Sequence, residues 1–129
     1  MSIVTAAFQK GLSKYATISG RASRPEFWWY VLAIFLIVVA AQVIDRVVIA
    51  TLIGLAPGAT PLSLLISLVF LVPNIAIGVR RMHDIGKSGW FLLLALIPFL
   101  GLLILIYFYT RPSDPGENAY GAPEPFITG

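Results

Sequence analysis

The sequence predicts an all-α membrane protein with three transmembrane helices and a short amphipathic interfacial helix near its N-terminus. Hydrophobic residues make up 58% of the 129 residues and charged residues 12%, whereas a soluble domain carries roughly a quarter charged residues. The mean hydropathy is +0.88. This composition excludes an ordinary water-soluble fold and a disordered chain. The length fits a single integral-membrane domain. The three longest stretches that contain no Asp, Glu, Lys or Arg are 27–44, 47–79 and 88–110.

The first uncharged stretch predicts a membrane helix over about 27–51. A bilayer core of roughly 30 Å needs about 20 helical residues, and the four aromatic residues at 27–30 suit the headgroup level. We expect Asp45 and Arg46 at the opposite interface, because a charge at the centre of a membrane helix costs on the order of 3 kcal/mol. A secretory signal peptide is the competing interpretation. Because 26 residues precede the run and no clear cleavage pattern closes it, we expect a retained helix.

The middle stretch of 33 residues is too long for a single crossing. Pro57 and Pro61 lie in a segment typical of a turn, which ends one helix and begins the next. The second membrane helix is therefore predicted over about 62–79. The third stretch predicts a helix over about 89–109, with Trp90 at its start as an interfacial anchor.

Lysine and arginine residues divide unequally between the two predicted sides of the membrane. Short loops rich in these residues stay in the cytoplasm, and only Arg46 and Arg111 fall on the opposite side. The sequence thus predicts a multi-pass protein with a cytoplasmic N-terminus and an exported tail over 111–129, which is extended because it is rich in proline and glycine. The seven residues predicted on the cytoplasmic side are Lys10, Lys14, Arg21, Arg24, Arg80, Arg81 and Lys87.

A short amphipathic helix is predicted before the first membrane helix. Val4, Phe8, Leu12 and Tyr15 recur at helical spacing, while lysines fall on other faces. Such a helix lies in the headgroup layer with its lysines towards anionic lipid. The alternative is a frayed, partly ordered end.

Polar residues gather in two motifs that the predicted topology places on the cytoplasmic side. Arginine outnumbers lysine there four to one, and its planar fork binds phosphate or carboxylate in a bidentate manner. This bias favours a site for an anionic group, most simply a lipid headgroup. The alternative is that these residues only set topology and anchor the helices. The candidate binding residues are Arg21, Arg24, Arg80, Arg81 and Lys87, and the candidate supporting residues are Glu26, His83, Asp84, Trp28, Trp90 and Asn74.

Two local pairings are expected within and near these motifs. Arg80 and Asp84 lie four residues apart, so they pair if the second helix continues past residue 79. Asn74 follows Pro73 inside that helix, where an amide side chain typically hydrogen-bonds to a neighbouring helix.

No catalytic residue, metal site or cofactor is predicted. Cysteine is absent and His83 is the single histidine, which is a poor donor set for a transition metal. Asp84 is badly placed to orient His83, because adjacent helical residues point about 100° apart. A net charge of +3 does not indicate nucleic-acid binding. The expected function is a membrane module that interacts with lipid or with a partner, as a homo-oligomer or with another membrane protein. The alternatives are a subunit of a transport assembly and a small lipid-modifying enzyme.

Four motifs in order resemble a bacterial family of proteins of unknown function, number 805. The resemblance runs from about residue 8 to residue 125 and implies a protein of the bacterial inner, or plasma, membrane without an established activity. Two positions depart from the family pattern: Met82 stands where the family more often has leucine, and Ala119 stands where it often has arginine. The motifs are Gly20-Arg21-x-x-Arg24-x-Glu26-Phe27-Trp28, Arg80-Arg81-x-His83-Asp84-x-Gly86-x-Ser88-Gly89-Trp90, Ile97-Pro98-x-x-Gly101 and Gly116-Glu117-Asn118-x-Tyr120-Gly121.

The family pattern raises a question about the tail. If the motif at 116–121 belongs to the same site as Arg21 and His83, the tail is cytoplasmic and one hydrophobic stretch is not a simple crossing. Three crossings place the tail outside instead. We expect three crossings.

Overall fold

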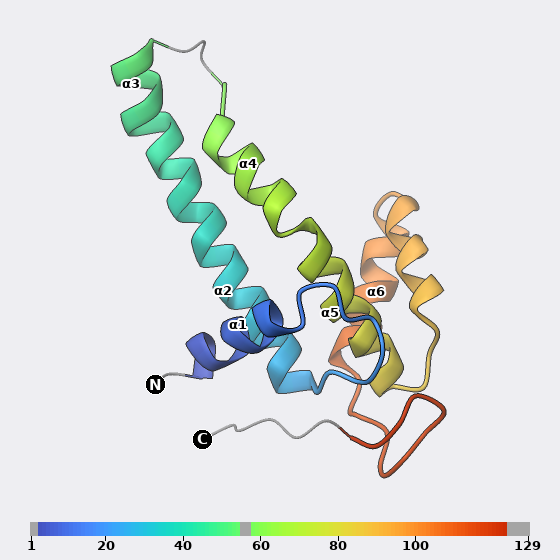
Figure 1. Ribbon diagram of the computed structural model, residues 1–129. Helices are drawn as coiled ribbons and strands as arrows, with labels where there is room; N and C mark the ends of the chain where they lie inside the picture. Colours follow the sequence, from blue (N-terminus) through green and yellow to red (C-terminus); the bar gives the residue numbers. More distant parts are fainter. Residues whose placement is uncertain (1–2, 55–57, 124–129) are drawn as a thin grey trace.

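A computed structural model describes residues 3–54 and 58–123, and within these ranges it contains helices and no strand. The longest element is nearly continuous: α2 (Arg24–Val43) passes into a π-helical stretch, η1 (Ile44–Ile49), and then into α3 (Ala50–Ile53). Ser23 caps α2 by accepting a hydrogen bond from the Glu26 amide, as serine does at helix N-termini. Figure 1 shows this rod running from the level of α1 to the opposite end of the molecule.

The chain returns beside the rod in a bent helix pair, α4 (Pro61–Val69) and α5 (Leu71–Asp84), whose axes differ by 44°. Pro73 explains the bend. It has no amide proton, so the carbonyl of Val69, four residues earlier, has no helical donor. The Tyr15 hydroxyl donates to that carbonyl instead. A side chain from outside the helix pair thus supplies the hydrogen bond that is missing at the bend.

The far end of the molecule is closed by Asp45. Its carboxylate accepts hydrogen bonds from the Leu62 amide at 2.9 Å and from the Ser63 amide and hydroxyl, each at 2.7 Å. Asp45 therefore caps the N-terminus of α4, whose first amides lack helical partners. Pro61 begins α4 as predicted, whereas Pro57 of the predicted turn lies outside the described residues.

The first two predicted membrane helices correspond to elements of suitable length and composition. Residues Arg24–Ile49 form one helix long and apolar enough to cross a membrane, and α4 with α5 form a second if the bent pair counts as one span. Only 17% of the most apolar window of the first helix is buried inside the molecule, unlike the core helix of a soluble protein.

The third hydrophobic stretch is not a single helix, so the predicted helix over 89–109 is wrong. It forms a 3₁₀ helix, η2 (Gly89–Leu96), and a separate α6 (Leu100–Thr110) that runs back beside it. Each arm is about 16 Å long from its rise per residue, roughly half of a bilayer core.

The hairpin turn has two local causes. Pro98 disfavours helix at the preceding residue, and Phe99 at the tip adopts a positive φ of 61°. Gly101 lies against the Leu94 carbonyl so closely that a Cβ there would overlap it. Glycine at this position therefore lets the two arms meet.

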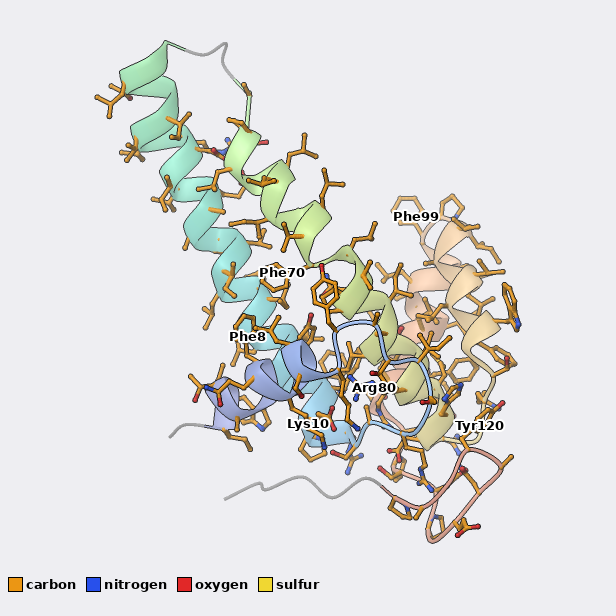
Figure 2. All side chains as sticks on the ribbon, in the orientation of Figure 1. Phe8, Lys10, Phe70, Arg80, Phe99 and Tyr120 are labelled. Carbon is orange, nitrogen blue, oxygen red and sulfur yellow. The ribbon has the colours of Figure 1, made fainter. Side chains whose placement is uncertain are left out.

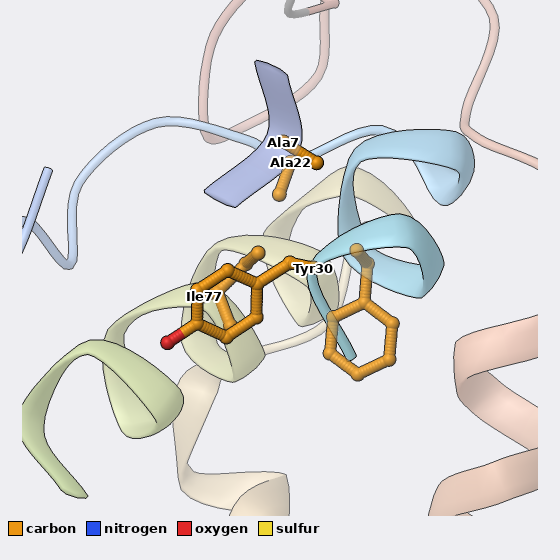
Figure 3. Packing of buried hydrophobic residues seen from close by; sticks show 5 residues of the cluster. Ala7, Ala22, Tyr30 and Ile77 are labelled. Carbon is orange, nitrogen blue, oxygen red and sulfur yellow. The ribbon is translucent and has the colours of Figure 1, made fainter. Parts of the chain in front are cut away.

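α1 (Ile3–Ser13) is a helix, as the amphipathic pattern predicts. It crosses α2 and the bend between α4 and α5. Gly11 lies directly against the Tyr30 ring, and the rings of Phe8 and Phe70 are 5.8 Å apart. Figure 3 shows the small core that results, which consists of Ala7, Ala22, Phe27, Tyr30 and Ile77.

Candidate functional site

Five charged side chains are buried together where the start of α2, the end of α5 and the loop after α1 meet. Each is at most 1% exposed. Burying unpaired charges is costly, so each needs partners that replace water. Figure 2 places Arg80 and Lys10 in this region, with Tyr120 of the tail below α5. The five residues are Arg21, Glu26, Arg80, Arg81 and Asp84.

Arg21 joins the end of α5 to the C-terminal tail. Its Nε donates to Asp84 Oδ1 at 2.8 Å and its Nη2 to the Asp84 carbonyl at 3.2 Å. The remaining bonds go to tail carbonyls: Nη2 to Asp114 at 2.7 Å, and Nη1 to Gly116 at 2.7 Å and Gly121 at 3.1 Å. All three nitrogens of the guanidinium are therefore engaged inside the protein.

Arg81 holds the last carbonyls of α6. Its Nη1 donates to the second oxygen of Asp84 at 2.7 Å. Its Nε and Nη2 donate to the Tyr109 carbonyl at 3.3 and 3.2 Å, and Nη2 also reaches the Arg111 carbonyl. Carbonyls at a helix C-terminus lack helical donors and favour a nearby cation. Arg81 therefore caps α6 and fixes the returning arm of the hairpin to α5.

Two further side chains from α2 complete the cap. Arg24 donates to the Thr110 carbonyl at 3.1 Å, and the Trp28 indole donates to the Tyr109 carbonyl at 3.0 Å. Both residues were expected to act at the membrane interface. The structure brings them onto the end of α6, so they join α2 to the hairpin.

Arg80 pairs with α2 rather than within its own helix. Its Nη1 lies 3.0 Å from Glu26 Oε2, and Lys10 Nζ lies 3.1 Å from the other Glu26 oxygen. The expected pair between Arg80 and Asp84 is wrong, because Asp84 is occupied by Arg21 and Arg81. The Nε and Nη2 atoms of Arg80 are buried without a hydrogen-bond partner in the described part of the chain.

His83 is held by backbone and by the tail. Its Nδ1 is 2.9 Å from the Gly20 carbonyl, and its ring stacks on Tyr120 with centroids 4.0 Å apart and planes at 2°. Since a carbonyl only accepts, Nδ1 carries the proton, which leaves Nε2 as an acceptor in the neutral imidazole. The Asn118 amide donates to the His83 carbonyl at 2.9 Å. Asp84 makes no contact that would orient the imidazole.

The position of the tail corrects the predicted topology. The amide of Asp114 donates to the Asp84 carbonyl at 2.8 Å, and the Ser113 hydroxyl donates to the Asp84 carboxylate. The tail over 111–123 therefore lies at the same end of the molecule as Arg21 and His83, and its predicted place on the opposite side is wrong. The physical reason is the hairpin, which returns the chain to its starting end.

Two cations that line one cavity at this end have no carboxylate partner among the described residues. Lys87 Nζ lies over the rings of Phe91 and Phe108, 5.6 and 5.4 Å from their centroids, and Arg111 Nη1 donates to the Tyr107 hydroxyl at 2.8 Å. Both line a cavity of about 150 Å³ with Ile85, Phe108, Pro112 and Asp114. Arg111 was not predicted as a site residue, because the expected topology placed it outside.

The remaining candidate residues lie away from this cavity. Asn74 accepts a hydrogen bond from the Tyr30 hydroxyl at 2.7 Å, which joins α5 to α2. Trp90 is exposed at the start of η2. Within residues 3–54 and 58–123, no three His, Cys, Asp or Glu side chains gather as they would to hold a metal ion.

The chain is similar to proteins of the bacterial inner membrane. Residues 15–122 match the family described as "Protein of unknown function (DUF805)". The chain is 34% identical to the "Inner membrane protein YhaH" of Escherichia coli (strain K12), over 92% of this chain and 94% of that protein. It is 36% identical to the "Inner membrane protein YhaI" of the same organism, over 85% and 87% respectively. No solved structure matches it.

Proposed function

Since the chain belongs to the DUF805 family, whose relatives are named inner membrane proteins, we propose that it is a two-pass membrane module whose basic end binds an anionic lipid headgroup in the cytoplasmic leaflet. The predicted family and the inner-membrane assignment are confirmed by these relatives. We propose, in addition, that the chain crosses the membrane twice, that its basic end faces the cytoplasm and that an anionic lipid is the ligand.

The lengths of the helices support two crossings. The rod from Arg24 to Ile49 has the length of a bilayer core, and α4 with α5 returns beside it. The hairpin of η2 and α6 reaches about half that depth and exposes apolar side chains, including Phe99 at its tip, which is 86% exposed. Such a hairpin enters one leaflet and leaves on the same side.

The charge distribution supports a cytoplasmic location for the basic end. That end carries eight of the nine lysine and arginine residues, and only Arg46 lies at the other end. Positively charged residues in short segments favour the cytoplasmic side. Because the tail lies at the basic end, both described ends of the chain face the cytoplasm in this proposal.

One observation carries the headgroup site: Lys87 and Arg111 line one cavity and lack a carboxylate partner in the described ranges. Arg21 and Arg81 are committed to Asp84 and to carbonyls, so they have little capacity left for an external anion. Of the predicted binding residues, the proposed site therefore keeps only Lys87, and it adds Arg111. A lipid phosphate near two cations forms charge-assisted hydrogen bonds.

Lipid retention by the purified protein tests this proposal. Native mass spectrometry would compare phosphatidylglycerol with phosphatidylethanolamine at equal concentration, for the natural protein and for the Lys87→Gln, Arg111→Gln double variant. We expect phosphatidylglycerol to be preferred, because no ammonium group offsets its phosphate charge. We expect its retention to fall at least tenfold in the variant, since even one lost charged hydrogen bond is worth about 1.5–3 kcal/mol. The Arg46→Gln variant is the control at the other end. Equal retention of phosphatidylglycerol by the natural protein and by the Lys87→Gln, Arg111→Gln variant contradicts the proposal.

A further inference from the structure

A second, larger recess lies between α5 and the hairpin. It has a volume of about 440 Å³, within the range of small-molecule sites. Its walls come from α5, from η2 and from the loop that follows α1. The residues that line it are Ile18, Ile75, Val79, His83, Ser88, Gly89, Trp90, Leu92 and Leu93, and none carries a carboxylate, ammonium or guanidinium group.

The recess is long and changes character along its length. Ile75, Val79 and His83 are spaced four residues apart on one face of α5, so they mark a stripe of about 12 Å. The stripe begins with aliphatic side chains at the level of the hairpin arms. It ends at the polar residues beside the loop 85–88. This is the form expected of a site for an amphipathic molecule with one apolar chain.

The polar end offers a defined hydrogen-bonding pattern. Nδ1 of His83 is committed to the Gly20 carbonyl, and no described residue hydrogen-bonds to Nε2. With its proton on Nδ1, the neutral form of the imidazole presents Nε2 as an acceptor. The Ser88 oxygen accepts from the Trp90 amide at 3.3 Å, so its own proton remains available to donate. One acceptor and one donor thus stand at the same end of the apolar stripe.

We propose that this recess binds one acyl chain of a membrane phospholipid whose headgroup carries a hydrogen-bond donor. The chain lies along Ile75 and Val79, a phosphate oxygen accepts from Ser88, and a hydroxyl or ammonium of the headgroup donates to His83 Nε2. The site discriminates by hydrogen bonding. It is therefore separate from the charge-selective cavity of Lys87 and Arg111, and it rests on the proposed function only for the placement of the hairpin in the membrane.

The surroundings of the recess favour lipid as its occupant. Its apolar wall continues on both sides into exposed apolar surface, with Leu71 and Ile75 of α5 each 50% exposed and Leu96 of η2 also exposed. In a protein of the inner membrane that surface meets acyl chains. A peptide would bring backbone amides and carbonyls, which this wall, with its aliphatic side chains, does not satisfy.

Headgroup selectivity and groove filling test the proposal together. The full-length protein would be analysed by native mass spectrometry with phosphatidylethanolamine and phosphatidylcholine of identical chains, since the choline headgroup has no donor. We expect one retained lipid, with phosphatidylethanolamine favoured about fivefold, as one net hydrogen bond provides. The Ile75→Trp variant fills the recess and should lose the retained lipid. Its control is Leu71→Trp, one turn away and equally exposed but outside the recess.

A third variant assigns the selectivity to the imidazole. His83→Phe keeps a ring against Tyr120 and removes both nitrogens, so we expect lipid retention to persist while the preference over phosphatidylcholine disappears. Equal retention of the two lipids by the natural protein, or equal retention by the Ile75→Trp and Leu71→Trp variants, overturns the proposal. The Arg46→Gln variant, at the other end of the molecule, should leave this preference unchanged. A phosphatidylethanolamine preference found without selective retention of phosphatidylglycerol would separate failure of the headgroup site from failure here.

Discussion

At the scale of single residues, Asp84 connects more of the molecule than any other charge at the basic end. Each of its carboxylate oxygens pairs with a different arginine, Arg21 at 2.8 Å and Arg81 at 2.7 Å, and its carbonyl accepts from the tail amide of Asp114. Through these partners one side chain links α5 to the loop before α2, to the end of α6 and to the tail.

The Asp84→Asn variant tests this role. It leaves two buried guanidiniums without their counter-charge, and removing one partner of a buried ion pair costs about 3–5 kcal/mol. We expect the free energy of unfolding in detergent to fall by that amount and the tail to become sensitive to protease. Glu117→Gln, an exposed carboxylate in the tail, is the control and should leave both measurements unchanged. Loss of less than about 1 kcal/mol in Asp84→Asn would show that the arginines are satisfied without it.

The sequence predicted how the arginines at the basic end bind other groups, but it did not predict which groups they bind. The excess of arginine over lysine indicates planar, bidentate recognition, and Arg21 and Arg81 do recognise a carboxylate and carbonyls in this way. The groups that they bind belong to the same chain and lie up to 100 residues away. Spacing along the sequence carries no information about such distant partners, so an external anion was the simpler expectation.

At the scale of elements, the bend between α4 and α5 depends on a contact from outside the pair. Pro73 leaves the Val69 carbonyl without a helical donor, and Tyr15 provides one. The bend therefore fixes the loop after α1 against α4 and α5.

A double-mutant cycle tests this dependence. Tyr15→Phe should lower the free energy of unfolding by about 1 kcal/mol. In a Pro73→Ala background residue 73 regains its amide proton, so the same change should cost almost nothing. The two variants and their combination would be compared by thermal unfolding in one detergent. An equal cost of Tyr15→Phe in both backgrounds would contradict the role assigned to Pro73.

The hairpin of η2 and α6 depends on Gly101, the residue at which the two arms come closest to each other. Gly101→Val places a branched side chain where even a Cβ overlaps the Leu94 carbonyl, so the arms of η2 and α6 cannot meet. We expect the thermal stability to fall and the tail to lose its protection from protease. Ala95→Val, on an exposed position of the same hairpin, is the control. Unchanged protection of the tail in Gly101→Val would show that the close approach is not required.

Hydropathy predicted where the apolar segments lie but not how each one crosses. The first and second segments contain helices that match the predicted ranges to within a few residues. The third segment is equally apolar, but the chain turns back on itself within it. That turn depends on Pro98, Phe99 and Gly101 through backbone geometry and packing, which hydropathy does not describe. The family motif at 116–121 was the available signal, because it raised the possibility that the tail lies beside Arg21 and His83.

At the scale of the whole molecule, the two ends are chemically different. One end gathers the ion pairs, the tail, the cavity of Lys87 and Arg111 and the opening of the lipid recess. The other carries α3 and the start of α4, whose N-terminus Asp45 caps. In the proposed arrangement, two crossings and a hairpin confined to one leaflet keep the first end entirely on one face of the membrane. Both proposed lipid sites depend on this arrangement.

Site-directed labelling tests this arrangement of the chain in the membrane, since the natural chain has no cysteine. Single cysteines at Ser13, Thr51 and Ala119 would be exposed to a membrane-impermeant thiol reagent in spheroplasts and again after lysis. We expect the cysteine at 51 to be labelled from outside and those at 13 and 119 to be labelled only after lysis. Labelling at both 51 and 119 from outside, with 13 protected, would mean that residues 89–109 cross the membrane and that the tail is exported.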